Sequence, residues 1–483
     1  MNRRYVRRDG DRQADNKLNL DPARGEDGMH LDACIKCGAC TAQCPVAAVY
    51  PLFPGPKSVG PDAERLRLEG IALAPGCLAY CTNCKTCEVT CPSGVCITDM
   101  ILQVRRQEQE AGTGKAICRL GMRDHLLGRA EYLGRLGTLW PPLANTVLGW
   151  KITRRLLEKT LGISARAPLP RYGRKFRTSD IAPVVGKTQS HGETESYGET
   201  ERYGQSEEHG RGKTEHGCRK TEPSDRVKTD RKGRSTQKVV YFPGCFISYN
   251  DEATGQAVVK VLEHNGFEVI VPGFHCCGVP LTANGRFREA TANAQHNLGL
   301  MQPYLEQGIP VIASCTSCGL ALKEDYPRVS APGAQRIGAQ TYDLFEFLWV
   351  LHERGELRKD FREVQASLAY HAPCHLKAQG IGTPSVRILR LIPGVKIQEL
   401  DAGCCGLSGS FAFKAEKYEL SLQIGSTLFQ RVQGGVKEKA FQAVATECGG
   451  CQVQIEHGSG APSLNPVWVL YQAYGLGISS AIG

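Results

Sequence analysis

The sequence has no long apolar run and no motif for a nucleotide cofactor. Its 483 residues contain no stretch of about 18 consecutive apolar residues, so no single helix is expected to span a bilayer. No G-x-G-x-x-G motif follows an expected strand, so neither a flavin site nor a nicotinamide site is evident. Residues 1–20 contain no apolar segment of the kind found in secretory signals. We therefore expect a protein of the reducing cytoplasm that carries no organic redox cofactor of its own.

The positive charge is concentrated in one part of the chain. The formal net charge is +10, and residues 115–177 alone contain 14 Lys and Arg against 3 Asp and Glu. The rest of the chain is therefore close to neutral. This distribution is not that of a uniformly basic nucleic-acid-binding protein, so no nucleic-acid partner is expected.

Composition divides the chain into segments, and 22 cysteines mark most of them. In a reducing compartment, clustered cysteines indicate metal or redox chemistry rather than disulfides. Residues 186–236 have almost no aliphatic side chains to offset chain entropy, so we predict a disordered linker over 181–236 in which Cys218 plays no part. The expected segments are a polar tail at 1–29, a ferredoxin domain at 30–108, a basic helical connector at 109–180, the linker, and two cysteine-rich domains at 237–358 and 366–483.

Two copies of the spacing C-x2-C-x2-C-x3-C-P lie between residues 34 and 92. The short spacers let one loop supply three thiolates to a [4Fe–4S] cubane, while the fourth cysteine of each motif reaches the other cluster. Helices are expected between the motifs, which makes this an α-helical dicluster ferredoxin domain. The predicted ligands are Cys34, Cys37, Cys40 and Cys91 for one cluster, and Cys81, Cys84, Cys87 and Cys44 for the other.

Zinc ribbons are the alternative, because they also use C-x2-C pairs. Four zinc ligands from two pairs would leave the third cysteine of each triplet unexplained. Cys77, Cys96 and Cys118 lie outside the motifs, and we expect them to be small buried hydrophobic residues.

Residues 237–483 contain an internal duplication. Short apolar runs alternate with helical patterns in both copies, which predicts a small α/β unit used twice. The cysteines would then lie on loops at the ends of strands, where sites in such folds are usually built. The first set is Cys245, Cys276, Cys277, Cys315 and Cys318, and the second is Cys374, Cys404, Cys405, Cys448 and Cys451.

Each set contains an isolated cysteine, an adjacent pair followed by glycine, and a C-x2-C pair. This pattern resembles the family of CCG or cysteine-rich domains, which includes heterodisulfide reductase subunits and iron–sulfur subunits of glycolate and lactate oxidation systems. The resemblance implies a noncubane [4Fe–4S] cluster in a complete set, hence one or two clusters beyond the cubanes. Three alternatives remain open for each set, because the number of ligands does not fix the cluster type. The set could bind zinc, hold a cubane with one spare thiol, or carry no metal. His275, His371 and His375 are expected to form loop hydrogen bonds rather than bind metal.

Longer stretches resemble the family of C subunits of anaerobic glycerol-3-phosphate dehydrogenases. They include YPLFPGPK at 50–57, CCGVPLTANG at 276–285 and YHAPCH at 370–375. The resemblance implies a non-catalytic iron–sulfur subunit that passes electrons from flavin-containing dehydrogenase subunits to membrane quinone in anaerobic respiration. It also implies peripheral attachment at the cytoplasmic face of the cell membrane. An iron–sulfur subunit of a glycolate or lactate oxidase, a heterodisulfide-reductase-like catalytic subunit and a zinc scaffold without redox role are the alternatives.

Residues 144–162 predict one basic amphipathic helix. Such a helix can lie in the interface of an anionic membrane, or it can pack its apolar half on the protein's own core. At about 100° per residue, the apolar half has Trp150, Ile152, Leu156, Leu157 and Leu161, and the polar half has Lys151, Arg154, Arg155, Glu158 and Lys159.

Overall fold

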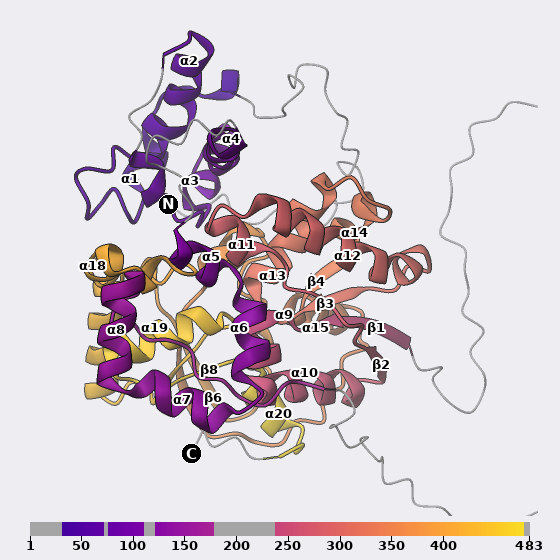
Figure 1. Cartoon of the computed structure of the whole chain (residues 1–483). Coiled ribbons are helices and arrows are strands. Elements are labelled where there is room, and N and C mark those ends of the chain that lie inside the picture. The colour runs from indigo at the N-terminus through magenta and orange to yellow at the C-terminus, as the bar shows by residue number, and fades with distance from the viewer. Residues whose placement is uncertain (1–30, 72–75, 111–120, 178–236, 478–483) are drawn as a thin grey trace, which may run out of the picture. The chain divides into compact units, whose positions relative to one another are not determined.

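The computed structural model describes residues 31–71, 76–110, 121–177 and 237–477 (Figure 1). The expected tail at 1–29, the predicted linker at 181–236, Cys118 and Cys218 lie outside these residues. Within the described part, the predicted fold class is confirmed: a helical ferredoxin region and a helical connector precede two parallel α/β units.

Sharp turns shape the ferredoxin region, because both cysteine loops contain left-handed residues. Lys36 and Gly38 in the first motif, and Asn83 and Lys85 at the equivalent places in the second, have φ between 54° and 77°. These residues tighten each loop, and a short helix follows directly. The elements are η1 (Leu31–Ala33), α1 (Ala39–Ala42), η2 (Ser58–Asp62), α2 (Ala63–Leu68), η3 (Cys77–Tyr80), α3 (Thr86–Val89) and α4 (Ile97–Glu110).

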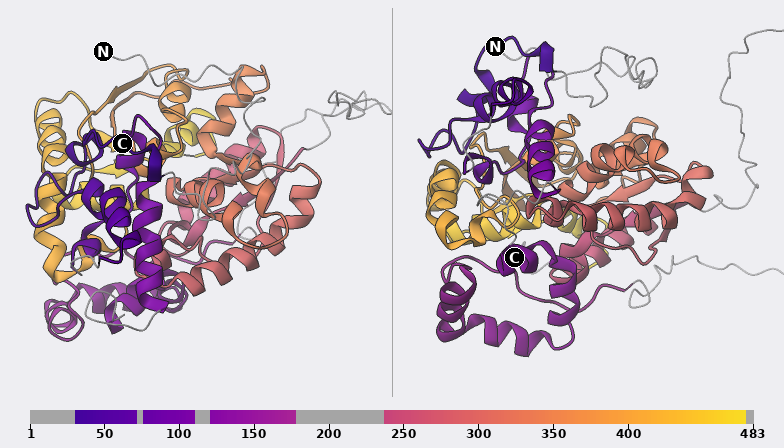
Figure 2. Two further views of the ribbon diagram at one scale, coloured as in Figure 1. Left: turned by 90° about the horizontal axis from the view of Figure 1, so that it is seen from above. Right: turned by 45° about the horizontal axis from the view of Figure 1, so that its top comes forward.

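The connector consists of short helices, drawn in purple in Figure 2, and it corrects one prediction. We predicted a single helix over 144–162, but the backbone of Trp150 is extended (φ −68°, ψ 129°) and divides it. Gly149, a poor helix former, immediately precedes the break. The helices are α5 (Met122–Gly128), α6 (Ala130–Gly137), α7 (Pro141–Gly149) and α8 (Lys151–Leu161).

The second correction concerns Arg154, which we placed on the charged, solvent-facing half. Its side chain is buried and donates hydrogen bonds to the carbonyl oxygens of Ser164 (2.9 Å) and Ala165 (3.1 Å). The apolar residues Ile152 and Leu156 are instead 81% and 58% exposed. The segment that returns after α8 supplies the carbonyls, which helix periodicity alone could not show.

The first α/β unit is a parallel sheet in the order β2-β1-β3-β4. Val240 of the central strand pairs with Ile270 on one side and with Val311 on the other. The strands are β1 (Gln237–Phe242), β2 (Phe267–Ile270), β3 (Val311–Ala313) and β4 (Thr341–Asp343). The helices are α9 (Gly244–Tyr249), α10 (Glu252–His264), α11 (Val279–Ala283), α12 (Phe287–Glu306), α13 (Thr316–Leu320), η5 (Ala321–Asp325), η6 (Tyr326–Arg328), α14 (Ala334–Gln340) and α15 (Leu344–Glu353).

The second unit repeats this topology in the order β6-β5-β7-β8, so the duplication seen in the cysteine pattern extends to the sheet. The strands are β5 (Ala366–Tyr370), β6 (Val395–Glu399), β7 (Ala443–Ala445) and β8 (Ser463–Leu464). The helices are α16 (Cys374–Ala378), α17 (Pro384–Leu389), η7 (Phe411–Phe413), α18 (Ala415–Lys437), α19 (Gly449–Ser459) and α20 (Val467–Ala473).

The two units share one hydrophobic core. Val239 and Tyr241 of β1 belong to the same buried cluster as Leu368 and Tyr370 of β5. The indole of Trp468 on α20 also donates a hydrogen bond to the hydroxyl of Thr254 on α10 (2.9 Å). Burial of this shared surface stabilises the pair as one body.

The glycine after each adjacent cysteine pair has a steric role that can be tested at Gly406. Its φ is +86°, and a Cβ atom there would lie 2.0 Å from the backbone oxygen of Ser421 on α18. Gly406→Ala is therefore expected to lower the free energy of unfolding by about 2–4 kcal/mol, measured by urea denaturation. Gly409→Ala is the control, because Gly409 also has a positive φ (+64°) but nothing within 4 Å, and it should cost only about 1 kcal/mol. Equal losses in the two variants would contradict a role for close approach to α18.

Candidate metal centres

The four cysteines predicted for the first cubane line one cavity. Cys34, Cys37, Cys40 and Cys91 all contribute to its wall, together with Lys57. Cys40 is buried and Cys37 is exposed, so one side of the site faces solvent. The backbone N–H of Val95 donates a hydrogen bond to the Cys91 sulfur (3.4 Å), a contact that stabilises a thiolate.

The thiols of the second motif lie around Cys44, the last cysteine of the first motif. Burial raises the pKa of Cys44 to about 11, with smaller contributions from the charges of Cys84 and Cys81. Burial likewise raises the pKa of Cys87, and the charges of Cys81, Cys84 and Cys44 add to this increase. The fourth cysteine of each motif thus lies beside the thiols of the other motif. Because metal ligation requires thiolates, iron binding here would release protons.

The first five-cysteine set is gathered beyond the carboxyl ends of parallel strands. Cys245 lies in α9 after β1, the adjacent pair follows β2, and Cys315 follows β3. The sulfurs of Cys245 and Cys276 are 3.6 Å apart. Hydrogen bonds from Cys276 and Cys318 lower the pKa of Cys277 to about 6. A hydrogen bond from Cys318 lowers the pKa of Cys315 to about 7. Neighbouring thiols thus favour the thiolate form of two cysteines in this set, which is the form that metal ligation requires.

The second set has the same placement after β5, β6 and β7. The sulfurs of Cys405 and Cys451 are 3.3 Å apart, and the backbone N–H of Gly406 donates to the Cys404 sulfur (3.4 Å). Three possible ligand atoms lie within 4.8 Å of one another: a ring nitrogen of His371 and the sulfurs of Cys405 and Cys451. All three residues are buried. His371 is therefore placed to bind metal, whereas the sequence led us to expect only a loop hydrogen bond.

The donor atoms of both sets fit a sulfur-ligated metal centre. Five thiols gather in each set, and the carboxylate of Glu131 on α6 lies beside the first set, where it accepts a hydrogen bond from the backbone N–H of Cys276 (2.7 Å). Soft thiolate ligands select iron–sulfur clusters, zinc or copper(I) over hard cations. In both sets hydrogen bonds from neighbouring thiols lower the pKa of the second cysteine of the adjacent pair, Cys277 in the first and Cys405 in the second. When bound, an iron–sulfur cluster would supply one-electron redox chemistry at these positions.

Comparisons with known proteins agree with this geometry. The family model "4Fe-4S dicluster domain" matches residues 30–95, and the model "Cysteine-rich domain" (CCG) matches residues 239–323 and 368–456. The C subunit of the anaerobic glycerol-3-phosphate dehydrogenase of Escherichia coli K12 is 32% identical over 449 residues, covering 92% of this chain and 98% of that protein. The chain belongs to this family of C subunits.

More distant relatives share about half of the chain. The B subunit of the fumarate reductase (CoM/CoB) of Methanothermobacter marburgensis is 30% identical over 237 residues, which are 48% of this chain and 44% of that protein. The D subunit of the dihydromethanophenazine:CoB--CoM heterodisulfide reductase of Methanosarcina barkeri is 27% identical over 246 residues, which are 49% of this chain and 57% of that protein. This member of the C-subunit family is therefore an iron–sulfur protein with a dicluster domain for two [4Fe–4S] clusters and two further cysteine groups suited to metal.

One histidine of this C-subunit homologue connects three cysteine loops. His375 follows Cys374, and its ring bonds to the carbonyl oxygen of Asn83 (Nε2···O, 3.1 Å) and to the hydroxyl of Ser317 (Nδ1···Oγ, 2.8 Å). Asn83 lies between Cys81 and Cys84, and Ser317 between Cys315 and Cys318. A carbonyl can only accept, so Nε2 carries the proton and Nδ1 accepts from Ser317.

Burial lowers the pKa of His375, which favours the neutral ring that these two bonds require. Sequence reasoning expected a hydrogen bond here, but it could not identify the partners, which lie in two other domains. His275, in contrast, stacks on His296 at 4.0 Å between ring centroids.

A buried lysine that the sequence analysis missed lies at the same junction. Lys85, in the spacer between Cys84 and Cys87, forms ion pairs with Glu88 (3.1 Å) and Asp99 (3.6 Å) of the ferredoxin region. It also pairs with Glu324 (3.0 Å) of the first α/β unit. In sequence Lys85 is an ordinary polar loop residue; only the fold buries it to 4% exposure.

Two cysteines outside the motifs are less buried than we expected. Cys77 and Cys96 are only partly buried, although Cys77 packs against the ferredoxin core. Cys77 therefore lies at the boundary of that core rather than in its interior.

Removal of the Lys85 charge should weaken the junction. Lys85→Met removes the cation shared by Glu88, Asp99 and Glu324, of which Asp99 keeps its ion pair with Arg328 (2.8 Å). Stability is therefore expected to fall by about 2–4 kcal/mol. The measurement is thermal unfolding of the anaerobic protein with its iron content determined in parallel. Lys238→Met removes a cation from an exposed pair with Glu268 (3.8 Å) and should change stability by less than about 0.5 kcal/mol. If Lys85→Met unfolds at the same temperature as this control, the ion network does not stabilise the junction.

Proposed function

We propose that this chain is the electron-transferring C subunit of an anaerobic glycerol-3-phosphate dehydrogenase. It would receive electrons from flavin-containing dehydrogenase subunits and pass them to membrane quinone, without oxidising the organic substrate itself. The observation that carries the proposal is the His375 junction, at which loops from all three cysteine-bearing domains meet. The 32% identity over nearly the full length of the Escherichia coli protein supports the choice of donor.

We assign the ligands in a crossed pattern, because each fourth cysteine lies beside the other motif. The cavity around Cys34 includes Cys91, and the pKa of Cys44 responds to Cys81 and Cys84. The proposed cubane ligands are Cys34, Cys37, Cys40 and Cys91 for the first cluster, and Cys81, Cys84, Cys87 and Cys44 for the second. For the duplicated domains we propose a noncubane cluster on each complete five-cysteine set.

The exposure of the cysteines suggests the direction of electron flow. Cys37 of the first cubane site is exposed, and its neighbour Ile35 is 67% exposed. Burial raises the pKa of Cys374, and the charge of Cys84 in the second cubane site is the next contribution. The pKa of Cys404 is raised by Cys405 and by burial, with smaller contributions from Cys374 and Cys84. Since electron transfer slows steeply with distance, we propose that the first cubane receives electrons and the second passes them to the cysteine-rich sets.

Membrane attachment is proposed through the connector. Among the described helices, none combines the length and apolar content needed to cross a bilayer. Trp150, Ile152 and Leu156 are nevertheless more than half exposed, beside the exposed cations Lys151 and Arg155. This combination is typical of helices that lie in the interface of an anionic membrane. We therefore propose a peripheral position at the cytoplasmic face of the cell membrane.

A heterodisulfide-reductase-like catalytic role is the second candidate. It is favoured by the similarity to the D chain of that enzyme and by the dense thiol sets. Purified chain supplied with a reductant would then turn over a disulfide substrate without partner subunits.

Metal and electron-transfer measurements on the anaerobically purified chain test the main proposal. We expect iron and acid-labile sulfide in equal amounts, at about eight of each for two cubanes and more if the cysteine-rich sets are loaded. EPR should show clusters that are reduced by glycerol 3-phosphate only when the flavin-containing partner subunits are added. Zinc in place of iron, or clusters that these partners cannot reduce, would contradict the proposal.

His375 gives a second test, because we propose that it positions the loops for electron transfer. His375→Ala removes two hydrogen bonds and should cost about 1–3 kcal/mol of stability. It should also slow electron arrival at the cysteine-rich sets, followed by rapid-freeze EPR, while the iron content stays unchanged. His264→Ala is the control, since His264 bonds only to Asp360 (3.1 Å) and stacks on Tyr474, away from the cysteine loops. Loss of stability with an unchanged electron-transfer rate would restrict His375 to a structural role.

A further inference from the structure

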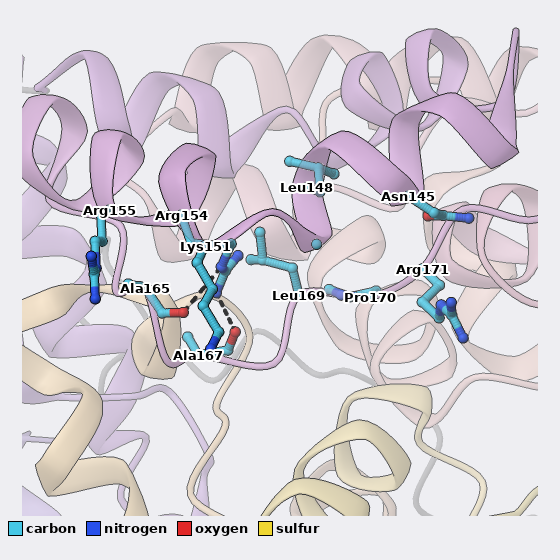
Figure 3. Close-up of a pocket in the computed structure, with 11 residues that line it drawn as sticks. Asn145, Leu148, Lys151, Arg154, Arg155, Ala165, Ala167, Leu169, Pro170 and Arg171 are labelled. Carbon is cyan, nitrogen blue, oxygen red and sulfur yellow. Dashed lines mark hydrogen bonds between the residues drawn. The ribbon is translucent and has the colours of Figure 1, made fainter.

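A cavity of about 410 Å³ lies between α8, the end of α7 and the segment that returns along them (Figure 3). Four cationic side chains line it, and neither Asp nor Glu does. Leu148, Leu169 and Pro170 form the apolar part of the wall. The cations are Lys151, Arg154, Arg155 and Arg171.

Arg154 fixes one side of the cavity. Figure 3 shows its guanidinium bonded to the carbonyl oxygens of Ala165 and Ala167, and it also donates to Ser164 (2.9 Å). These acceptors are neutral, so the positive charge of this 9%-exposed side chain is not cancelled by a carboxylate in the wall. A buried, held cation of this kind favours an anion nearby.

The other cations are free to meet such an anion. Lys151 and Arg155 lie one turn apart on α8, and Arg171 approaches from the returning segment. Within residues 31–71, 76–110, 121–177 and 237–477, none of the three has an ion-pair partner. Four like charges in one wall repel one another. Glu158 of α8, which is not part of the wall, offsets some of this at Arg154, and an anionic ligand would offset more.

The surroundings of the cavity distinguish a lipid from a small soluble anion. Trp150 is 57% exposed and Ile152 is 81% exposed, and both are sequence neighbours of Lys151 in the cavity wall. Leu156, beside Arg155, extends the same apolar strip. A soluble phosphate would leave this strip in water, whereas a phospholipid would cover it with acyl chains while its phosphate enters the cationic cavity.

We propose that this cavity binds the headgroup phosphate of an anionic phospholipid, with the acyl chains against Trp150, Ile152 and Leu156. The inference rests on the proposed membrane attachment and adds to it a defined headgroup site. Each cation near an anionic membrane contributes about 1 kcal/mol, so Lys151 and Arg155 together should change affinity by about tenfold or more.

The test compares two anionic vesicles of matched surface charge, using the full chain with its clusters. One contains phosphatidylglycerol and the other contains oleate, which carries a carboxylate in place of the phosphate. The wild-type chain should sediment preferentially with phosphatidylglycerol. Lys151→Gln/Arg155→Gln should lose this preference, with about tenfold weaker binding to phosphatidylglycerol. Lys159→Gln/Lys175→Gln removes the same charge from exposed sites outside the cavity and should weaken binding to both kinds of vesicle equally.

Each other outcome has a separate meaning. If the wild-type chain shows no preference, or the cavity variant keeps it, the headgroup site is wrong although membrane attachment stands. If the wild-type chain binds neither vesicle, attachment and the headgroup site both fail. Ile152→Ser/Leu156→Ser should lose binding to both kinds of vesicle. Unchanged binding would show that the apolar strip does not contact the acyl chains and would overturn this part of the proposal. Saturable binding of soluble glycerophosphate without vesicle binding would assign the cavity to a free anion and overturn the lipid proposal.

Discussion

The contact of α16 with two other cysteine loops is the interaction on which the proposed relay depends. His375 joins the backbone at Asn83 to the side chain of Ser317, while Lys85 joins the ferredoxin region to Glu324. Both residues are withdrawn from bulk water, so their hydrogen bonds and ion pairs act with little screening and hold the loops in one arrangement. Without such contacts, the cysteine sets would be separate metal sites on a single chain.

Parallel sheets explain why ten cysteines form only two sets. In each unit the cysteines follow three neighbouring strands, and the carboxyl ends of parallel strands meet at one edge of the sheet. The two units share one topology, but they contact the ferredoxin region through different side chains. Glu324 of the first unit pairs with Lys85, whereas Lys417 of the second lies over the rings of Tyr80 and Phe411 and donates to the carbonyl of Ala79. Burial lowers the pKa of Lys417 to about 7.

The connector differs from an ordinary amphipathic helix that covers a core. Its buried residue in α8 is an arginine, and its exposed residues include Ile152, Leu156 and Trp150. The arginine is accommodated because three backbone carbonyls satisfy it, as required for a buried charged side chain. The apolar side chains are thereby turned outward, where they are available to a membrane.

Features that depend on local spacing could be predicted from the order of residues alone. The two C-x2-C-x2-C-x3-C-P motifs, the duplicated five-cysteine sets and the strand–helix alternation could all be recognised, because thiol spacing and hydrophobic period are properties of neighbouring residues. The fold class followed from them. Tertiary structure alone decided that His375 bonds to Asn83 and Ser317, that Lys85 is buried, that the helix at 144–162 breaks at Trp150, and that Arg154 turns inward. These features join residues up to 292 positions apart or depend on a returning segment, and only packing of the whole chain brings such groups together.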